Sequence, residues 1–130
     1  TQAGIDVMYS GSADKIRTNV DLRVNTDSRS FVQLGLGDIG EANRLNLQLG
    51  QQGKVWGGRF GVIEGKVGAG IDIKMGRDFK ISADAYDPND FRLKLRSELL
   101  IGPDTYLVGE SFNLNKDVQR SFFLGVRKTF

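Results

Sequence analysis

The last 12 residues, QRSFFLGVRKTF at positions 119–130, alternate between apolar and mostly polar side chains. One side of an extended chain would carry Phe122, Leu124, Val126 and Phe130. The other side would carry Ser121, Phe123, Gly125, Arg127 and Thr129. Successive side chains of a β-strand point to opposite faces, so the pattern predicts a strand with one hydrophobic and one mostly polar face.

Composition excludes several classes of function. A chain of 130 residues predicts a single domain, residues 1–130, that is long enough for one closed sheet. Without cysteine or histidine it has no disulfide framework, no thiolate metal site and no imidazole base. A net charge of +2 gives no indication of a nucleic-acid partner. The sequence shows neither an initiator Met nor a signal peptide, so we expect a mature form or an excised domain.

Ten segments alternate in this way or are bounded by turn residues. The predicted strands cover residues 4–9, 15–24, 30–37, 43–49, 54–63, 66–75, 79–86, 91–99, 105–111 and 119–130. Alternation is weakest in residues 105–111, so it does not clearly assign their faces. Turn signals such as Asp87-Pro88 separate the segments, and Glu64-Gly65 fits a two-residue hairpin connection.

A short helix is the alternative for the fourth segment. Residues 38–41 fit an N-terminal capping box before residues 42–49. Leu45, Leu47 and Leu49 alternate with a period of two, however, which favours a strand. Ten strands at hairpin spacing predict an all-β fold, an antiparallel up-and-down sheet that closes into a barrel and leaves no unpaired edge.

One face of the predicted strands is rich in charge. Its charged residues are Arg17, Asp21, Arg23, Arg59, Lys66, Asp72, Lys74, Lys80, Asp84, Arg92, Lys94, Arg96, Glu98 and Arg127. The opposite face is apolar at Ile16, Val20, Leu22, Leu34, Leu45, Leu47, Phe60, Ile71, Ile81, Leu93, Leu95, Leu124 and Val126. In a soluble barrel the apolar face would fill the inside. In a transmembrane barrel it would face lipid, and the charges would line the lumen.

Aromatic residues favour the membrane alternative. If the final Phe130 marks the periplasmic edge, the aromatic residues fall near two edges. Those near the same edge are Phe31, Trp56, Phe79 and Tyr106, and those near the other are Tyr9, Tyr86, Phe91, Phe112 and Phe122. A bilayer selects two aromatic belts around an aliphatic middle, and a terminal strand ending on Phe is typical of bacterial outer-membrane barrels. Phe31 and Tyr86 point inward by strict alternation, so the predicted belts are imperfect.

The second half of the chain resembles a known family. The stretches RFGVIEGKVGAGIDI and FKISADAYDPNDFRLKLRSELLIGPDTYLVGESFNLNKDVQRSFFLGVRKTF are similar to the C-terminal segment of certain mammalian-cell-entry (MCE) proteins of double-membraned bacteria. In that family a lipid-transfer domain precedes a C-terminal outer-membrane barrel. The resemblance implies phospholipid movement between the two membranes, an upstream MCE domain, outer-membrane lipids and barrel-assembly machinery as partners, and both termini in the periplasm, where an even number of strands also places them.

Catalysis and metal binding find little support in the residues. Barrel proteases and lipases of this size rely on histidine, which is absent, so we expect no enzymatic activity and no cofactor. The inward carboxylates Asp72, Asp84 and Glu98 have Lys or Arg neighbours and fit ion pairs better than acid–base work. Asp87, Asn89 and Asp90 could hold calcium, but the sequence favours a proline-containing turn without a metal ion.

The inward charges leave two functions open for the lumen. Ten cations face four carboxylates in the set above, and unpaired buried ions cost several kcal/mol each, so the lumen either holds water or binds anionic groups. A basic conduit for phospholipid headgroups is one interpretation, and a plugged membrane anchor is the other. A passage would run beside Gly57, Gly61, Gly68 and Gly70, unless these glycines serve wall curvature.

The main prediction is therefore an outer-membrane barrel that anchors an MCE-type phospholipid-transport protein and could form its exit port. A small independent outer-membrane pore and a soluble ten-stranded lipid-binding barrel are the alternatives. The fatty-acid-binding proteins exemplify the soluble class, although the sequence offers no segment for their helical lid.

Overall fold

A computed structural model describes residues 2–11, 14–41, 43–115 and 121–130. These residues form ten β-strands: β1 (Gln2–Ser10), β2 (Lys15–Asn25), β3 (Ser30–Gly37), β4 (Arg44–Gln52), β5 (Trp56–Ile63), β6 (Lys66–Met75), β7 (Phe79–Tyr86), β8 (Arg92–Gly102), β9 (Thr105–Phe112) and β10 (Ser121–Thr129). No helix with the length and hydrophobicity of a membrane span occurs in the described part of the chain.

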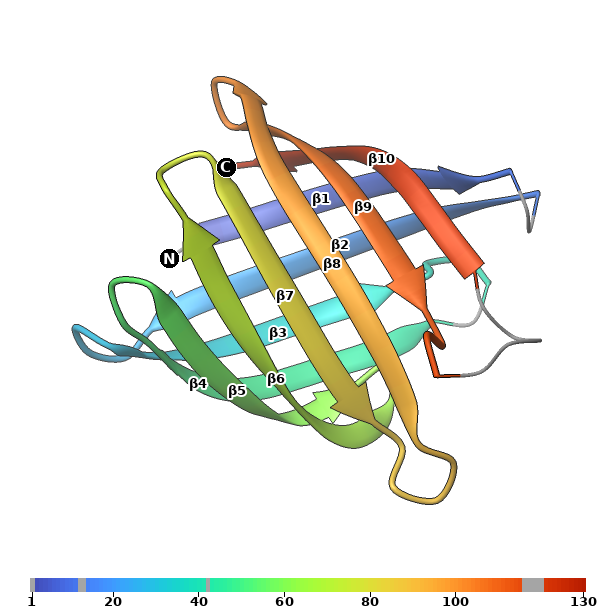
Figure 1. Cartoon of the computed structure of the whole chain (residues 1–130), viewed down its shortest axis with the longest axis horizontal. Coiled ribbons are helices and arrows are strands. Elements are labelled where there is room, and N and C mark those ends of the chain that lie inside the picture. The colour runs from blue at the N-terminus through green and yellow to red at the C-terminus, as the bar shows by residue number, and fades with distance from the viewer. Residues whose placement is uncertain (1, 12–13, 42, 116–120) are drawn as a thin grey trace.

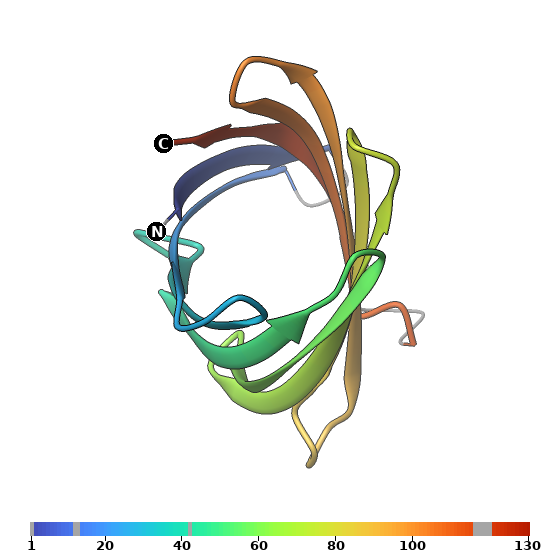
Figure 2. The ribbon, with the colours of Figure 1, turned by 90° about the vertical axis from the view of Figure 1, so that its left-hand side faces the viewer.

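The ten strands form a closed antiparallel barrel (Figures 1 and 2). Each strand pairs with its neighbour in sequence, and β1 pairs with β10 through a register that sets Val7 opposite Val126. The backbone N–H of Phe130 also donates to the carbonyl of Ala3 at 2.9 Å. The predicted up-and-down barrel is therefore confirmed.

The predicted strand boundaries agree closely with the structure. β3, β6 and β7 have the predicted limits, and β4 is a strand rather than the alternative helix. β8 extends past its prediction to Gly102 because a bulge between Leu100 and Gly102 lets it continue pairing with β9. Residues 119–120 of the last predicted segment lie outside the described residues.

The barrel has two distinct ends. The terminal end carries both chain termini and the turns that follow β2, β4, β6 and β8, and it faces the viewer in Figure 2. The distal end carries the turns that follow β1, β3, β5 and β7. The two-residue β5–β6 turn has positive φ at both Glu64 (51°) and Gly65 (79°), as its predicted hairpin type requires.

The distribution of side chains is inverted relative to a soluble protein. Among the described residues, 29 large hydrophobic side chains are exposed and only seven are buried. Twelve polar or charged residues are buried, including Asp6, Arg59, Asp84 and Glu110. The strands thus turn their charged face inward and their apolar face outward.

Candidate functional site: the charged interior of the barrel

The interior of the barrel encloses a cavity of about 380 Å³. Amide side chains line it at Gln2, Gln33, Gln48 and Gln52, together with nine basic and eight acidic residues. The basic residues are Arg17, Arg23, Arg59, Lys74, Arg77, Lys80, Lys94, Arg96 and Arg127. The acidic residues are Asp6, Asp21, Glu64, Asp72, Asp78, Asp84, Glu98 and Glu110. Positive and negative groups are therefore nearly balanced.

Twelve of the fourteen charges predicted to face the lumen line this cavity. They are Arg17, Asp21, Arg23, Arg59, Asp72, Lys74, Lys80, Asp84, Lys94, Arg96, Glu98 and Arg127. Lys66 and Arg92 are the exceptions. Lys66 begins β6 and is exposed, and Arg92 begins β8 and pairs with Asp87 and Asp90 outside the cavity. Both are the first residues of their strands, at the distal edge of the wall. There the alternation of side chains does not determine whether a side chain reaches the cavity.

The predicted excess of inward cations is wrong, mainly because three further carboxylates are buried inside, and also because Asp78 lines the mouth of the cavity while Lys66 and Arg92 do not line it. Asp6 faces inward from β1, Glu110 from β9, and Glu64 from the β5–β6 turn. The alternation of Ile5, Val7 and Tyr9 already implied an inward Asp6. Glu110 lies in the segment whose faces were least clear, and no periodicity describes a turn residue such as Glu64.

Glu64 connects opposite walls of the barrel near the distal end. Its carboxylate accepts hydrogen bonds from Arg17 Nη2 on β2 at 2.6 and 2.5 Å, and from Lys94 Nζ on β8 at 3.1 Å. The side-chain oxygen of Asn46 holds the turn by accepting the Glu64 backbone N–H at 3.0 Å. Burial alone would raise the pKa of Glu64, but the positive charges of Lys94 and Arg17 outweigh burial and lower that pKa to about 2.

Glu110 continues the network toward β8. Its carboxylate lies 3.2 Å from Lys94 Nζ and 3.1 Å from Arg96 Nη1, and its side chain is fully buried. Neither carboxylate oxygen has a well-aligned hydrogen bond, so the negative charge of Glu110 is balanced by its ion pairs with Lys94 and Arg96. Removal of Glu110 would leave two cations without that counter-charge.

Arg127 on β10 links three strands near the middle of the wall, because it binds residues of β1 and β2. Its guanidinium binds Asp21 through two hydrogen bonds of 2.6 and 2.8 Å and Asp6 through one of 2.9 Å. Arg96 reaches the same Asp6 at 3.0 Å and Glu98 at 2.9 Å. Because these strands include β1 and β10, the network also ties together the seam where the barrel closes.

Arg59 forms a second, separate cluster on β4–β7. Its guanidinium donates to both oxygens of Asp72 at 2.8 and 2.9 Å and to Asp84 at 2.7 Å. It also donates to the side-chain oxygen of Gln48 at 2.7 Å. Arg59 is thus bound on every side, as a buried guanidinium requires.

An apolar cluster fills one side of the distal interior. Met8, Val108, Phe112 and Phe123 are each at most 6% exposed and pack together, with Tyr106 against them. The rings of Phe112 and Phe123 meet edge to face at 5.6 Å. Tyr106 and Phe112 were predicted in the aromatic belts, but both lie on the inner face of β9 with Val108 and Glu110.

The inward glycines do not open a passage. A Cβ atom at Gly57, Gly61 or Gly68 would lie within 2.2–2.5 Å of a carbonyl oxygen on the neighbouring strand. At Gly70 it would lie 2.1 Å from the carboxylate of Asp84. Close approach within the wall explains these residues, which favours the curvature interpretation over a conduit.

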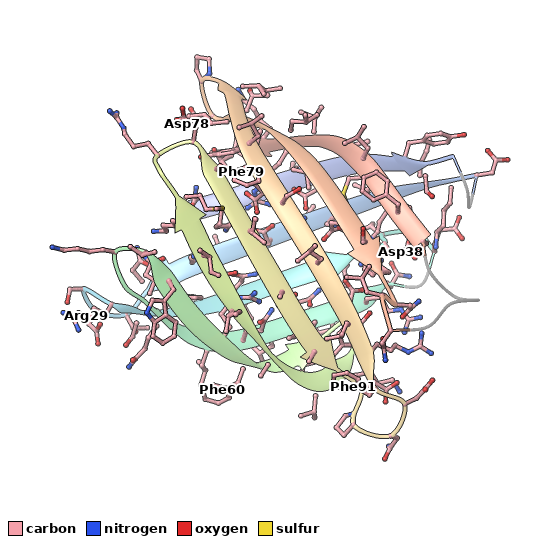
Figure 3. The ribbon with its side chains drawn as sticks, in the orientation of Figure 1. Arg29, Asp38, Phe60, Asp78, Phe79 and Phe91 are labelled. Atoms are coloured by element: carbon pink, nitrogen blue, oxygen red, sulfur yellow. The ribbon has the colours of Figure 1, made fainter. Side chains whose placement is uncertain are left out.

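The outer surface forms an apolar band with aromatic residues near its rims. Exposed members of the predicted lipid-facing set are Ile16, Val20, Leu22, Leu34, Leu45, Leu47, Phe60, Ile71, Leu95, Leu124 and Val126. Ile81 and Leu93 of that set are half-buried between neighbouring side chains. Figure 3 shows Phe60 and Phe91 on the outside of the ribbon.

The belt residues other than Tyr106 and Phe112 divide between the two ends. Trp56 and Phe130 are exposed at the terminal end, where Phe79 lies half-buried at the rim of the cavity. At the distal end the exposed aromatics are Tyr9, Phe91 and Phe122. Phe31 and Tyr86 are buried inside, as strict alternation predicted.

The described residues contain no group of three or more carboxylates arranged to hold a metal ion. In the β7–β8 turn, the oxygens of Asp87 and Asp90 lie 3.7 and 3.1 Å from Arg92 instead. The turn interpretation of this segment is thereby favoured over the calcium site.

Comparison with known proteins places the chain in a family. A family model described as a lipocalin-like domain matches residues 11–130. The chain belongs to this lipocalin-like family. The model does not describe an MCE protein, and a comparison with curated proteins found no match.

One solved structure, described as "De novo design of transmembrane beta-barrels", resembles this lipocalin-like domain. It is 13% identical, with a TM-score of 0.46 over 99% of this chain and 93% of that chain. A likeness of this degree does not bear on function.

Proposed function

We propose that this lipocalin-like domain is a transmembrane β-barrel of the bacterial outer membrane that serves as an anchor and has no enzymatic activity. The observation that carries the proposal is the inverted surface: 29 large hydrophobic side chains of the described residues are exposed, while ion pairs such as Arg59–Asp72 and Arg127–Asp21 lie inside. Water would be a poor solvent for such an exterior, whereas a bilayer requires it. Strands of 8 to 11 residues also suit a tilted crossing.

The family description favours a second candidate, a soluble lipid-binding barrel. Such a barrel holds its ligand against apolar inner walls. Here the cavity is lined by arginines, lysines, carboxylates and amides, and the apolar cluster around Phe112 is already filled by its own side chains. An acyl chain inside would have to displace paired ions, so this candidate has less support.

The choice between anchor and pore depends on the distal end. There Glu64 forms ion pairs with Arg17 and with Lys94 across the interior, beside the buried side chains of Met8, Ile63 and Phe123. Such packing supports a plugged anchor. In planar bilayers we expect the inserted protein to show no stable conductance, and steady channels would favour the independent pore.

The MCE connection is a finer proposal, and it rests on the resemblance of residues 59–130 alone. In this proposal the barrel anchors an MCE-type phospholipid-transport protein, with both termini in the periplasm and outer-membrane lipids and barrel-assembly machinery as partners. The lipocalin-like family match does not supply this link. Sequencing the gene upstream of the barrel tests it, because an adjoining MCE domain is the expected result.

Membrane insertion is the decisive test of the main proposal. Leu22→Arg and Leu95→Arg each place a cation in the middle of the outer band and should weaken insertion by about 2–4 kcal/mol. Ile101→Arg, on the same strand as Leu95 but at its end, is the matched control and should cost about 0–1 kcal/mol. Heat-modifiable gel migration after refolding into vesicles measures insertion. Normal insertion of both mid-band variants, or a monomer stable without detergent, would contradict the proposal.

A further inference from the structure

The terminal end of the cavity contains basic residues that the ion-pair network does not neutralise. Arg23 has no carboxylate within ion-pairing distance among the described residues. Its Nη2 donates to Gln33 Oε1 at 2.7 Å, its Nη1 approaches Gln52 Oε1 at 3.4 Å, and its guanidinium lies 4.0 Å over the ring of Phe31. Neutral amides and an aromatic face hold this arginine in place without cancelling its charge.

Two lysines bring further positive charge to the same region. Lys74 on β6 and Lys80 on β7 are direct cross-strand partners, and both line the cavity. Like charges at such positions repel each other. Lys80 and Arg23 line the same cavity from different walls of the barrel.

The carboxylates nearby are already engaged. Asp21 binds Arg127 and Asp72 binds Arg59, each through two hydrogen bonds. Glu98 lies 3.5 Å from Lys80 but lies closer to Arg96, at 2.9 Å. Asp78 lines the mouth of the cavity from the exposed β6–β7 turn, where Arg77 accompanies it. The local balance is therefore positive although the whole interior is nearly neutral.

We propose that the terminal end of the cavity binds a phosphate-class anion between Arg23, Lys74 and Lys80. An arginine whose fork is already oriented by two amides suits tetrahedral oxyanions, and the two lysines supply flexible point charges on the opposite wall. The phosphate could belong to free inorganic phosphate or to a phospholipid headgroup. The proposal goes beyond membrane anchoring and does not depend on it, because the cavity is the same whatever surrounds the barrel.

Calorimetric titration of the whole barrel with inorganic phosphate, at low ionic strength in octyl glucoside, tests the site. Arg23→Gln should weaken binding about tenfold, since a charge-assisted hydrogen bond is lost. Lys80→Gln should weaken it severalfold. The matched controls are Arg29→Gln and Lys54→Gln, two exposed cations of terminal-end turns that do not line the cavity (Arg29 is labelled in Figure 3). Both controls should bind like the parent.

A second titration with dihexanoyl phosphatidic acid identifies the source of the phosphate. Binding of the lipid but not of inorganic phosphate, with the same dependence on Arg23, assigns the site to a headgroup, and the reverse assigns it to a free anion. The proposal is overturned if neither ligand binds the parent, if Arg23→Gln and Lys80→Gln bind normally, or if the controls lose as much. Circular dichroism establishes that each variant is folded, and Arg23→Lys, which keeps the charge, should retain part of the affinity if Arg23→Gln does not fold.

Discussion

The two ends of the barrel interior solve the problem of buried charge differently. At the distal end, cations and carboxylates alternate in space from Arg17 through Glu64 and Lys94 to Glu110, beside a dry apolar cluster. At the terminal end, amides replace carboxylates as the partners of Arg23, and two lysines face each other. The distal ion pairs and apolar cluster fill and close that end of the barrel. The unneutralised cations at the terminal end can bind an anion.

The largest expected difference between the ends concerns the loss of one carboxylate. Glu110→Gln keeps the shape of the side chain but removes a counter-charge from Lys94 and Arg96, and should destabilise the barrel by about 3–5 kcal/mol. The same change at the terminal end, Asp78→Asn, should shift stability by less than about 0.5 kcal/mol because that carboxylate is exposed. Urea unfolding in vesicles measures both. Equal effects would remove the distinction between the two ends.

Acid should weaken the distal end through protonation of Glu64. The folded pKa of Glu64 is about 2, below its ordinary 4.5, so its contribution to stability is present above pH 4.5 and is lost as the pH falls toward 2. The contribution corresponds to about 3 kcal/mol. Unfolding curves between pH 6 and pH 2 should therefore fall more steeply for the parent than for Glu64→Gln. Parallel curves for the two proteins would show that Arg17 and Lys94 do not stabilise this carboxylate.

A smaller loss of stability is expected when a side chain is added to the wall at Gly61, in the distal half of β5. Gly61 has a φ of 145°, and a Cβ there would lie 2.2 Å from the carbonyl oxygen of Leu47. Gly61→Ala should cost about 1–3 kcal/mol through strain and overpacking. Gly58→Ala on the same strand meets open space and is the matched control, expected within about 0.5 kcal/mol of the parent. Similar melting temperatures for both variants would mean that the wall can relax at this position.

Strand positions and the inside–outside alternation could be predicted from the sequence because both depend on a local period of two. The face of residues such as Leu45 and Leu47 can be predicted because apolar and polar residues alternate around them, and both side chains are exposed as predicted. Alternation also predicted that Phe31 and Tyr86 point inward, whereas the aromatic belts required them outside. Both are buried, so alternation was correct.

The charge balance could not be predicted in the same way. Glu64 acts from a turn, where no periodicity applies, and its partners Arg17 and Lys94 are 47 and 30 positions away in sequence. Lys66 and Arg92 obey the alternation but begin their strands, so they lie outside the cavity. Which ions meet therefore depends on the tilt and register of the closed barrel, which a single sequence does not contain.

The pairing of β1 with β10 joins the first and the last strand of the chain. The closing contact between Val7 and Val126 spans nearly the whole chain in sequence. Contacts of such long range slow folding, and until β1 and β10 pair, each would present an unpaired edge to other chains.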